Sequence, residues 1–237
     1  MKIFFDHVYG NMFEREIIYS HVWASVHEEE RDEALESGWA ENRWVNDKTW
    51  WYPCRSTRIN IKNHKKNRKD SRLREKCSSV SYEIKNITDT DSIQLKKIED
   101  EHLKHKNFKD FYRPPIFDDK YLAVLYKENE ICHGYSIWIE SKKSYEIVEF
   151  YWDYHEPAMY LGKFNILCGI DICKDHSKKY LYIGDGYEKG CLYKNQFKGF
   201  EYWTGEEWSG DKKQYHFLCE RDSALKTIED LSNIPQS

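Results

Sequence analysis

The order of apolar patterns after residue 115 constrains the fold of this 237-residue chain more than any other feature. Apolar residues that alternate with polar ones indicate strands, and apolar residues that recur every three to four positions indicate helices. The expected elements are strands over 121–126, 134–140 and 146–152, a helix over 164–175, a strand over 179–183, a short helix over 192–196 and a strand over 199–203. We interpret the first three strands as antiparallel, so the patterns predict an α+β fold with a mixed, mainly antiparallel sheet flanked by helices.

This order of elements is typical of an acetyltransferase-like (GNAT-type) domain, which we expect to span residues 114–237. Residues 1–113 are expected to form an N-terminal α/β extension that includes a basic segment. Its predicted elements are a strand near Ile3–Phe5, a charged helix over 27–37 that ends at Gly38, strands over Thr57–Ile61 and Ser79–Ile84, and a helix capped by Asp91 that reaches residue 105.

Charge is unevenly distributed along the chain. Residues 62–76 (KNHKKNRKDSRLREK) contain eight lysines and arginines against two acidic residues, a local charge of +6. The whole chain has a net charge of −4, so the remainder carries −10. A basic patch on an acidic body can hold a polyanion at one place and repel it elsewhere. A solvated basic loop is the other interpretation of this segment.

The sequence predicts a cytoplasmic protein. The N-terminus lacks a basic start followed by a long apolar run, and no stretch is long and apolar enough to span a membrane. The seven cysteines are odd in number and scattered in spacing, so we expect reduced thiols.

Two blocks of the sequence resemble the arginyl- and leucyl-tRNA–protein transferases. The first block joins Pro53-Cys54-Arg55-Ser56-Thr57-Arg58-Ile59-Asn60-Ile61 to the basic segment, in which Ser71-Arg72 stands where the family has a Ser-x-Arg-Arg element. The second contains Phe150-Tyr151-Trp152-Asp153 near Pro157, then Tyr160-Leu161-Gly162-Lys163-Phe164, Tyr180-Leu181-Tyr182-Ile183-Gly184 and Tyr193-Lys194-Asn195-Gln196-Phe197. These elements come in the family's order and cover roughly residues 25–85 and 115–210.

The chain departs from this family in its cysteines. Family members carry paired cysteines near the N-terminus that bind a metal centre, whereas this chain has none before Cys54 and no Cys-x-x-Cys. Cys168 and Cys173 are five residues apart and are expected on different faces of a helix. We therefore expect no metal site and no cofactor, with aminoacyl-tRNA as a co-substrate.

The resemblance implies the transfer of an amino acid from tRNA to an amine. Such a reaction needs alignment of ester and amine, a proton acceptor and a donor to the oxyanion, but no covalent nucleophile. Asp153 is the first candidate for the group that binds the amine or acts as general base; a turn cap near Pro157 is its other interpretation. Tyr193 and Lys194 are candidate donors to the oxyanion or the terminal ribose, although Tyr193 also suits the core. The expected substrate-binding residues are Arg58, Gly162, Tyr182 and Tyr187.

The basic segment supplies the expected tRNA contacts, which position the RNA through its phosphates without reading its sequence. The candidate residues are Lys65, Lys66, Arg68, Lys69, Arg72 and Arg74. We expect this segment and the ester-binding part of the C-terminal sheet to lie on the same side of the protein.

Three functions remain open from the sequence. The first is aminoacyl-tRNA-dependent transfer, with arginine ahead of leucine as the cargo and a protein, a peptide or a small molecule as the acceptor. The second is an acyl-CoA-dependent N-acyltransferase, argued from the expected fold. The third is a non-catalytic module that binds RNA or protein.

Overall fold

The computed structural model describes residues 1–12, 15–42, 50–86, 89–106, 121–154, 159–225 and 230. The chain divides into two compact units. Unit 1 comprises Met1–Thr57, Asp185–Gln196 and Glu201–Ser237, and unit 2 comprises Arg58–Gly184 and Phe197–Phe200. The division expected between residues 113 and 114 lies outside the described residues, as do Pro114-Pro115 and Pro157.

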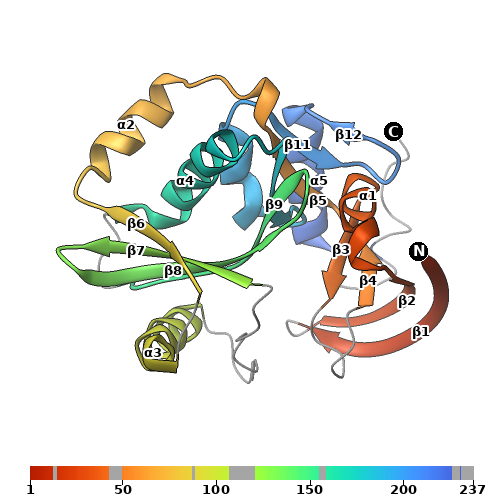
Figure 1. Cartoon of the computed structure of the whole chain (residues 1–237). Coiled ribbons are helices and arrows are strands. Elements are labelled where there is room, and N and C mark those ends of the chain that lie inside the picture. Colours follow the sequence, from red (N-terminus) through yellow and green to blue (C-terminus); the bar gives the residue numbers. More distant parts are fainter. Residues whose placement is uncertain are drawn as a thin grey trace. The chain divides into compact units, whose positions relative to one another are not determined.

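Unit 1 contains a four-stranded antiparallel sheet with the order β1-β2-β4-β3 (Figure 1). The strand expected near Ile3–Phe5 is confirmed and is longer than predicted. The strands are β1 (Lys2–Met12), β2 (Arg15–Ser25), β3 (Trp39–Asn42) and β4 (Trp50–Pro53). Tryptophans occupy the start of both β3 and β4, which agrees with the preference of aromatic side chains for half-buried strands.

The charged helix expected over residues 27–37 is confirmed as η1 (Glu28–Glu30) followed by α1 (Arg31–Glu36). Gly38 follows it with a φ of +78°, a left-handed conformation that ends many helices. A Cβ atom on Gly38 would lie 2.2 Å from the indole nitrogen of Trp203, so a side chain has no room there. Arg31 and Glu41 form a buried ion pair at 2.5 Å in the same unit.

The remaining elements of unit 1 lie near the C-terminal end of the chain. Tyr202 and Trp203 of β11 (Phe200–Trp203) pair with β12 (Trp208–Ser209), and η4 covers Lys189–Gln196. The helix α5 (Lys212–Ala224) was not predicted, although Asp211 caps it by accepting hydrogen bonds from two backbone amides at 2.9 and 3.1 Å.

Unit 2 is built on a sheet with the strand order β5-β10-β9-β8-β7-β6. Neighbouring strands from β6 to β9 are antiparallel, whereas β9 and β10 are parallel. The strands are β5 (Ser56–Asn60), β6 (Ser81–Lys85), β7 (Tyr121–Glu128), β8 (Ile131–Glu140), β9 (Ser144–Trp152) and β10 (Tyr180–Asp185). The expected mixed, mainly antiparallel α+β organisation is confirmed.

The pairing between β9 and β10 is short. It joins Ser144, Tyr145 and Glu146 of β9 to residues 180–182 of β10, whereas β9 continues for six further residues to Trp152. The carboxyl-terminal half of β9 therefore extends beyond the part that pairs with β10, toward Asp153.

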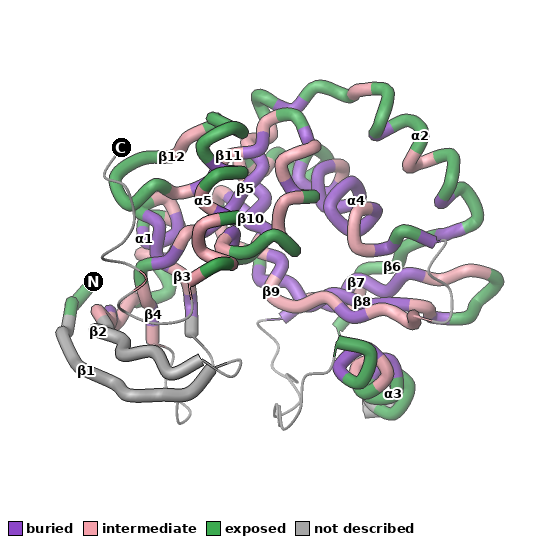
Figure 2. The backbone as a smooth tube through the Cα atoms, turned by 180° about the vertical axis from the view of Figure 1, so that it is seen from behind, coloured by how far each residue is buried: buried purple, intermediate pink, exposed green. Residues whose placement is uncertain are grey.

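Two helices cover opposite faces of this sheet: α3 (Asp89–His105) and α4 (Leu161–Asp175) (Figure 1). Leu95, Ile98 and Leu103 of α3 pack with alternate residues of β7 and β8 in one apolar cluster. On the other face, α4 buries Leu167 and Ile170 completely, as the helical pattern of the sequence predicted. Figure 2 shows α4 as mostly buried and α2 (Arg68–Lys76), which lies against α4, as mostly exposed.

The expected helix boundaries differ from the structure in two places. The helix α3 begins at Asp89, two residues before the predicted cap Asp91. The helix α4 begins at Leu161, three residues before the predicted start, so Gly162 lies in its first turn and not ahead of it. The first turn of α3 is polar, and in α4 Gly162 and Lys163 interrupt the apolar pattern after Leu161, so neither start stands out in the sequence.

The packing of α4 on the sheet generates a prediction from its two glycines. A Cβ atom on Gly169 would lie 2.7 Å from Leu181 and 3.1 Å from Trp138, both buried, whereas one on Gly162 would meet nothing closer than 3.7 Å. Gly169→Ala should therefore lower the free energy of unfolding by about 1–3 kcal/mol through overpacking, despite the better helix propensity of alanine. Gly162→Ala, the matched control, should change it by less than about 1 kcal/mol. Urea denaturation measures both, and equal effects would contradict the packing described.

Candidate functional site

Residues 68–76 of the basic segment form a capped helix, whereas residues 64–67 ahead of it have no regular secondary structure. Asn67 is the N-cap of α2: its side chain accepts hydrogen bonds from the amides of Lys69 and Asp70, at 2.7 and 3.2 Å. Asp70 returns the contact by accepting from the Asn67 amide at 3.0 Å, which completes a capping box. Because the Asp70 carboxylate is buried in this cap, it does not pair with the exposed lysines nearby.

One face of α2 is buried against α4 and the other is basic. Asp70, Leu73, Arg74 and Cys77 follow one another at helical spacing and are buried or half-buried. The exposed cations of the segment are Lys62, Lys65, Lys66, Arg68, Lys69, Arg72 and Lys76. Arg74, a predicted tRNA contact, instead pairs with Asp171 of α4 at 2.6 Å and is about one-third exposed. The other five predicted tRNA contacts are exposed cations, as phosphate binding requires.

Three contacts attach the basic segment to the length of α4. The ammonium of Lys174 lies 3.1 Å from Nδ1 of His64, near the end of α4, and Arg74 pairs with Asp171 one turn earlier. At the start of α4, the Lys76 ammonium donates to the Tyr160 hydroxyl at 3.1 Å and lies 4.2 Å from the centre of its ring. We call this set the α2–α4 clamp. It places the basic helix beside the first turn of α4.

His64 is the titratable member of the clamp. It is buried, and its Nε2 atom lies 3.6 Å from the Asp70 carboxylate. Burial, together with the charge of Lys174, lowers the pKa of His64 below its ordinary value, although Asp70 and Asp171 oppose the shift. The neutral imidazole accepts the Lys174 hydrogen bond, which a protonated ring could not do.

The first turn of α4 meets the carboxyl-terminal end of β9. Tyr160 is the N-cap residue in a left-handed conformation, with a φ of 52°, and no side chain caps the helix. Gly162, a predicted substrate-binding residue, faces Phe150 and Trp152, since a Cβ atom there would lie 3.7 and 3.8 Å from their rings. The amide groups of this turn form the positive end of the helix dipole.

Asp153, the predicted catalytic carboxylate, follows β9 directly. Its backbone amide donates to the carbonyl of His133 on β8 at 2.7 Å. One carboxylate oxygen lies 3.8 Å from Nδ1 of His133, with the two side chains 22% and 14% exposed. The structure thus brings Asp153 next to a histidine of the neighbouring strand.

The last turn of α3 packs against the same strand end. The backbone amide of Trp152 donates to Nδ1 of His102 at 3.3 Å, and His105 stacks on Tyr154 with 3.6 Å between ring centres. Burial raises the pKa of the Tyr154 hydroxyl to about 12, so it stays protonated at neutral pH. The residues on both sides of Asp153 are therefore held by aromatic packing.

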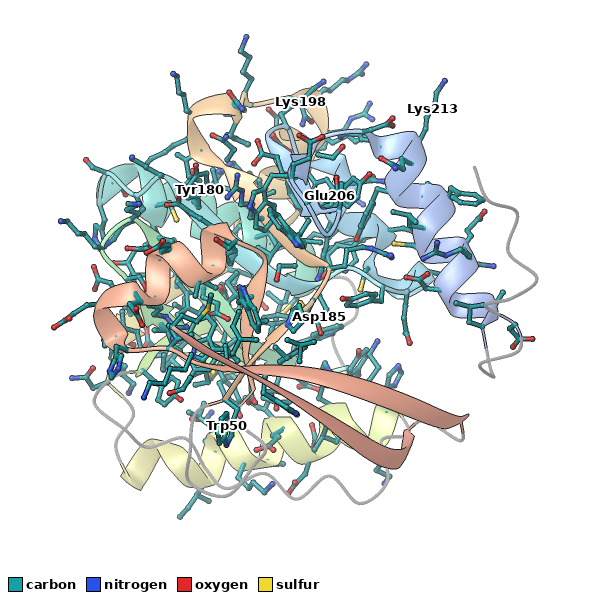
Figure 3. The ribbon with its side chains drawn as sticks, turned by 90° about the vertical axis from the view of Figure 1, so that its right-hand side faces the viewer. Trp50, Tyr180, Asp185, Lys198, Glu206 and Lys213 are labelled. Atoms are coloured by element: carbon teal, nitrogen blue, oxygen red, sulfur yellow. The ribbon has the colours of Figure 1, made fainter. Side chains whose placement is uncertain are left out.

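Two further predicted substrate-binding residues of unit 2 are buried. Arg58 is 6% exposed, and its guanidinium lies 3.9 Å from the ring centre of Tyr180, which Figure 3 labels. Tyr182 is 3% exposed, on the same strand as Tyr180. Both residues pack within the fold, so a contact with substrate would require access that this conformation does not provide.

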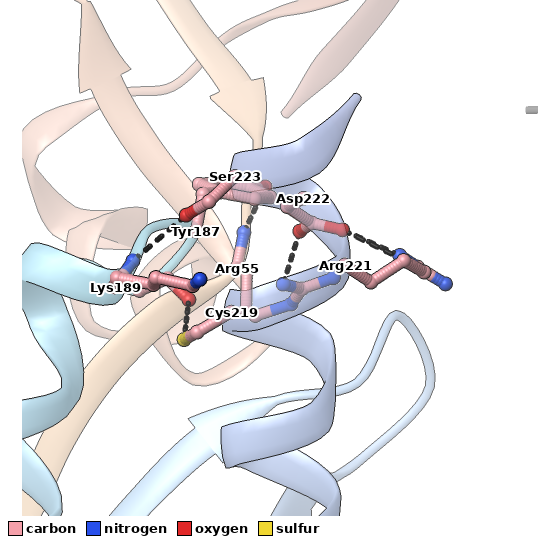
Figure 4. Close-up of polar contacts among 8 residues, drawn as sticks. Arg55, Tyr187, Lys189, Cys219, Arg221, Asp222 and Ser223 are labelled. Atoms are coloured by element: carbon pink, nitrogen blue, oxygen red, sulfur yellow. Dashed lines mark hydrogen bonds and ion pairs between the residues drawn. The ribbon is translucent and has the colours of Figure 1, made fainter. Parts of the chain in front are cut away.

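The remaining predicted site residues belong to unit 1. Tyr187 accepts a hydrogen bond from the backbone amide of Arg55, and burial raises the pKa of its hydroxyl well above the usual range. The Arg55 guanidinium lies 4.9 Å from the Tyr187 ring and pairs with Asp222 of α5 (Figure 4). Lys194 is buried and donates to the carbonyl of Asp185 at 2.5 Å, whereas Tyr193 is 37% exposed and so is not a core residue.

The described residues include no group of three or more histidine, cysteine or acidic side chains placed to hold a metal ion. All seven cysteines are described, and none forms a disulfide. Within the described parts, no helix combines the length and the apolar character that a membrane span requires.

Sequence reasoning missed Lys76 and His133. Lys76 is one of several cations in the basic segment, and its contact with Tyr160 joins residues 84 positions apart, so no local pattern could indicate it. His133 is an extra residue in the pairing of β8 with β7, and its sequence neighbours form no motif that would indicate it. The cap of α2 had a sequence signal in Asn67 followed three residues later by Asp70.

Comparison with known proteins finds a distant curated relative. An aspartate/glutamate leucyltransferase from Saccharophagus degradans is 24% identical over 168 residues, which cover 65% of this chain and 70% of the relative. The chain is similar in sequence to an aminoacyltransferase. This agrees with the coarser part of the resemblance described above and does not bear on arginine. No family model matches the chain.

Solved structures give weaker likenesses. One is the C-terminal domain of an Agrobacterium fabrum protein provisionally named a lysylphosphatidylglycerol synthetase, with a TM-score of 0.47 and 12% identity over 69% of this chain. Another is L-PGS from Bacillus licheniformis, with a TM-score of 0.45 and 12% identity over 66% of this chain. The chain spans about half of each, 54% and 49% respectively. Scores below 0.5 do not define a shared fold.

The lowered pKa of His64 predicts how the clamp responds to pH. Its ordinary value is 6.5, so between pH 7 and pH 5 the unfolded chain takes up a proton that the folded state resists. The free energy of unfolding should therefore fall over this range, and fall less in His64→Gln, whose amide can still accept from Lys174. His216→Gln, which replaces an exposed histidine, is the control. Urea denaturation at the two pH values measures the difference; identical pH dependence in wild type and His64→Gln would rule out this role.

Proposed function

We propose that this protein is an aminoacyl-tRNA-dependent aminoacyltransferase that moves an amino acid from tRNA to an amine of a protein or peptide. The observation that carries the proposal is the contact of Lys76 with Tyr160, which attaches a helix rich in exposed cations to the first turn of α4. The first turn of α4 also faces the end of β9, after which Asp153 follows. A polyanion-binding surface and a candidate transfer site therefore belong to the same unit.

The chemistry of these groups suits an activated ester. Exposed lysines and arginines of α2 bind phosphates of the tRNA and hold it without reading its sequence. The open amides at the start of α4 attract negative charge, such as the oxyanion that develops on the ester carbonyl. Asp153 attracts the ammonium of the acceptor. Alignment of ester and amine supplies most of the remaining acceleration, because the ester is already activated.

The cargo and the acceptor follow from the relatives. The resemblance in sequence points to arginine first and leucine second, whereas the name of the curated relative favours leucine. The same name makes a peptide that presents aspartate or glutamate the first acceptor to try. We propose that the reaction uses no cofactor besides aminoacyl-tRNA and takes place in the cytoplasm.

We also propose that unit 2, together with the chain segments that follow β10, has an acetyltransferase-like fold. Three antiparallel strands, β7 to β9, precede α4, which leads into β10, and β10 pairs with β9 in parallel over only three residue pairs. This order is the one that the sequence pattern predicted for a GNAT-type domain. Bound acetyl-CoA that raised the melting temperature would favour the acyl-CoA-dependent alternative.

Transfer itself provides the main test. Incubation with tRNA charged with labelled arginine or leucine, and with peptides that begin with aspartate, glutamate or a neutral residue, should yield peptides heavier by one amino acid. Asp153→Asn should slow this transfer by roughly a hundredfold or more while binding charged tRNA normally. Asp100→Asn, which alters an exposed carboxylate of α3, is the matched control. A wild-type protein that adds nothing to any acceptor would contradict the proposed function.

The exposed cations of the basic segment generate a second prediction. Lys65→Gln/Lys66→Gln/Lys69→Gln should weaken the binding of charged tRNA by roughly ten- to a hundredfold at low salt. Each lost phosphate contact should also reduce the slope of log affinity against log salt by roughly 0.7–0.9.

The control for this variant replaces the same number of exposed lysines on the opposite face of the sheet, in Lys96→Gln/Lys97→Gln/Lys104→Gln. Fluorescence anisotropy over a salt series compares the two triple variants. If both triple variants lost affinity equally, net charge and not the basic segment would account for RNA binding.

A further inference from the structure

His133 is an extra residue in strand β8. Across the β7–β8 ladder Tyr126 pairs with Gly134 and Lys127 pairs with Cys132, so His133 has no opposite residue and forms a β-bulge. Bulges bend a strand locally and redirect a side chain, and they are frequent beside active sites. The bulge here lies next to the strand end that carries Asp153.

The backbone and the side chains both join His133 to Asp153. The Asp153 amide donates to the His133 carbonyl at 2.7 Å, which fixes the two residues opposite each other. Nδ1 of His133 faces the carboxylate across 3.8 Å. This separation is longer than a hydrogen bond, as catalytic contacts often are before substrate binds. Among the described residues, Asp153 is the acidic residue that lies within ion-pair distance of His133.

The Nδ1 atom of His133 is buried and makes no hydrogen bond to any described residue. Buried polar atoms in folded proteins are almost always hydrogen-bonded, and an exception suggests a functional site. A short movement of the Asp153 carboxylate would satisfy Nδ1–H and leave Nε2 of the neutral ring unprotonated. The Asp153 carboxylate would then orient the His133 ring, and the unprotonated Nε2 atom would be able to accept a proton.

We propose that His133 is the general base of the transfer reaction and that Asp153 orients it. This inference rests on the proposed function and changes the role of Asp153 from base to positioning residue. In the reaction, the amine nitrogen forms a bond to the carbonyl carbon of the aminoacyl ester, and the bond between that carbon and the ribose oxygen breaks. The ammonium loses two protons overall: His133 passes one to the leaving ribose oxygen, and the other goes to solvent.

The test uses the full chain with charged tRNA and an accepted peptide. His133→Ala and His133→Gln should each reduce the transfer rate roughly a hundredfold or more, with tRNA affinity and melting temperature close to those of the wild type. Added imidazole should restore part of the rate to His133→Ala, because it can occupy the vacated space and accept the proton. The wild-type rate should fall at acidic pH more steeply than the His133→Gln rate, because a general base acts only in its unprotonated form, whereas the variant keeps only the pH dependence of the acceptor amine.

His216→Gln, an exposed histidine of α5, is the control and should leave the transfer rate and its pH dependence unchanged. Wild-type rates in either His133 variant, or a loss of rate that imidazole does not relieve in a folded His133→Ala protein, would overturn the assignment of His133. If His133→Ala does not fold, the pH profile of His133→Gln decides. A wild-type protein that transfers no amino acid from any charged tRNA would overturn the proposed function and this inference with it.

Discussion

The α2–α4 clamp is the interaction on which the candidate site depends. Four of the seven exposed cations of the basic segment lie on α2, and the clamp attaches that helix to α4, which is itself buried against the sheet. Its individual contacts are modest, since a half-exposed pair such as Arg74–Asp171 contributes about 1 kcal/mol or less. Their value is geometric. They distribute attachment over the length of α4, from Lys174 near its end to Tyr160 at its start.

Several modest contacts likewise fix the position of the end of β9, after which Asp153 follows. The face of α4 holds Phe150 and Trp152 from one side, while His102 and His105 of α3 hold Trp152 and Tyr154 from the other. Packing at these neighbouring positions restrains the backbone on both sides of Asp153. The bulge at His133 then places a second titratable group beside Asp153. Without the extra residue, the regular register of β7 and β8 would point the His133 side chain in another direction.

Local patterns predicted much of this fold. The alternation in β7, β8 and β9 and the helical stripe of α4 are strong signals, because each element buries one face and its sequence shows that face directly. The hairpin of β1 and β2 and the helix α5 were missed or underestimated. In α5 only Tyr215 and Cys219 are buried, which is too sparse a stripe to stand out among charged residues. Of the predicted site residues, five of the six proposed tRNA contacts are exposed cations and Asp153 is half-buried after β9, whereas Arg58 and Tyr182 are buried.

The sequence by itself determined the order of the elements from β7 to β11, the concentration of positive charge in residues 62–76 and the acidic residue at the end of a core strand. These are properties of neighbouring residues, and periodicity or composition records them. Only the tertiary structure decided which of these features meet. The contact of Lys76 with Tyr160, the extra residue at His133 and the division of the predicted site residues between two units all depend on strand register and helix packing. Register and packing are set by contacts between residues far apart in the chain, and a single sequence carries no local sign of them.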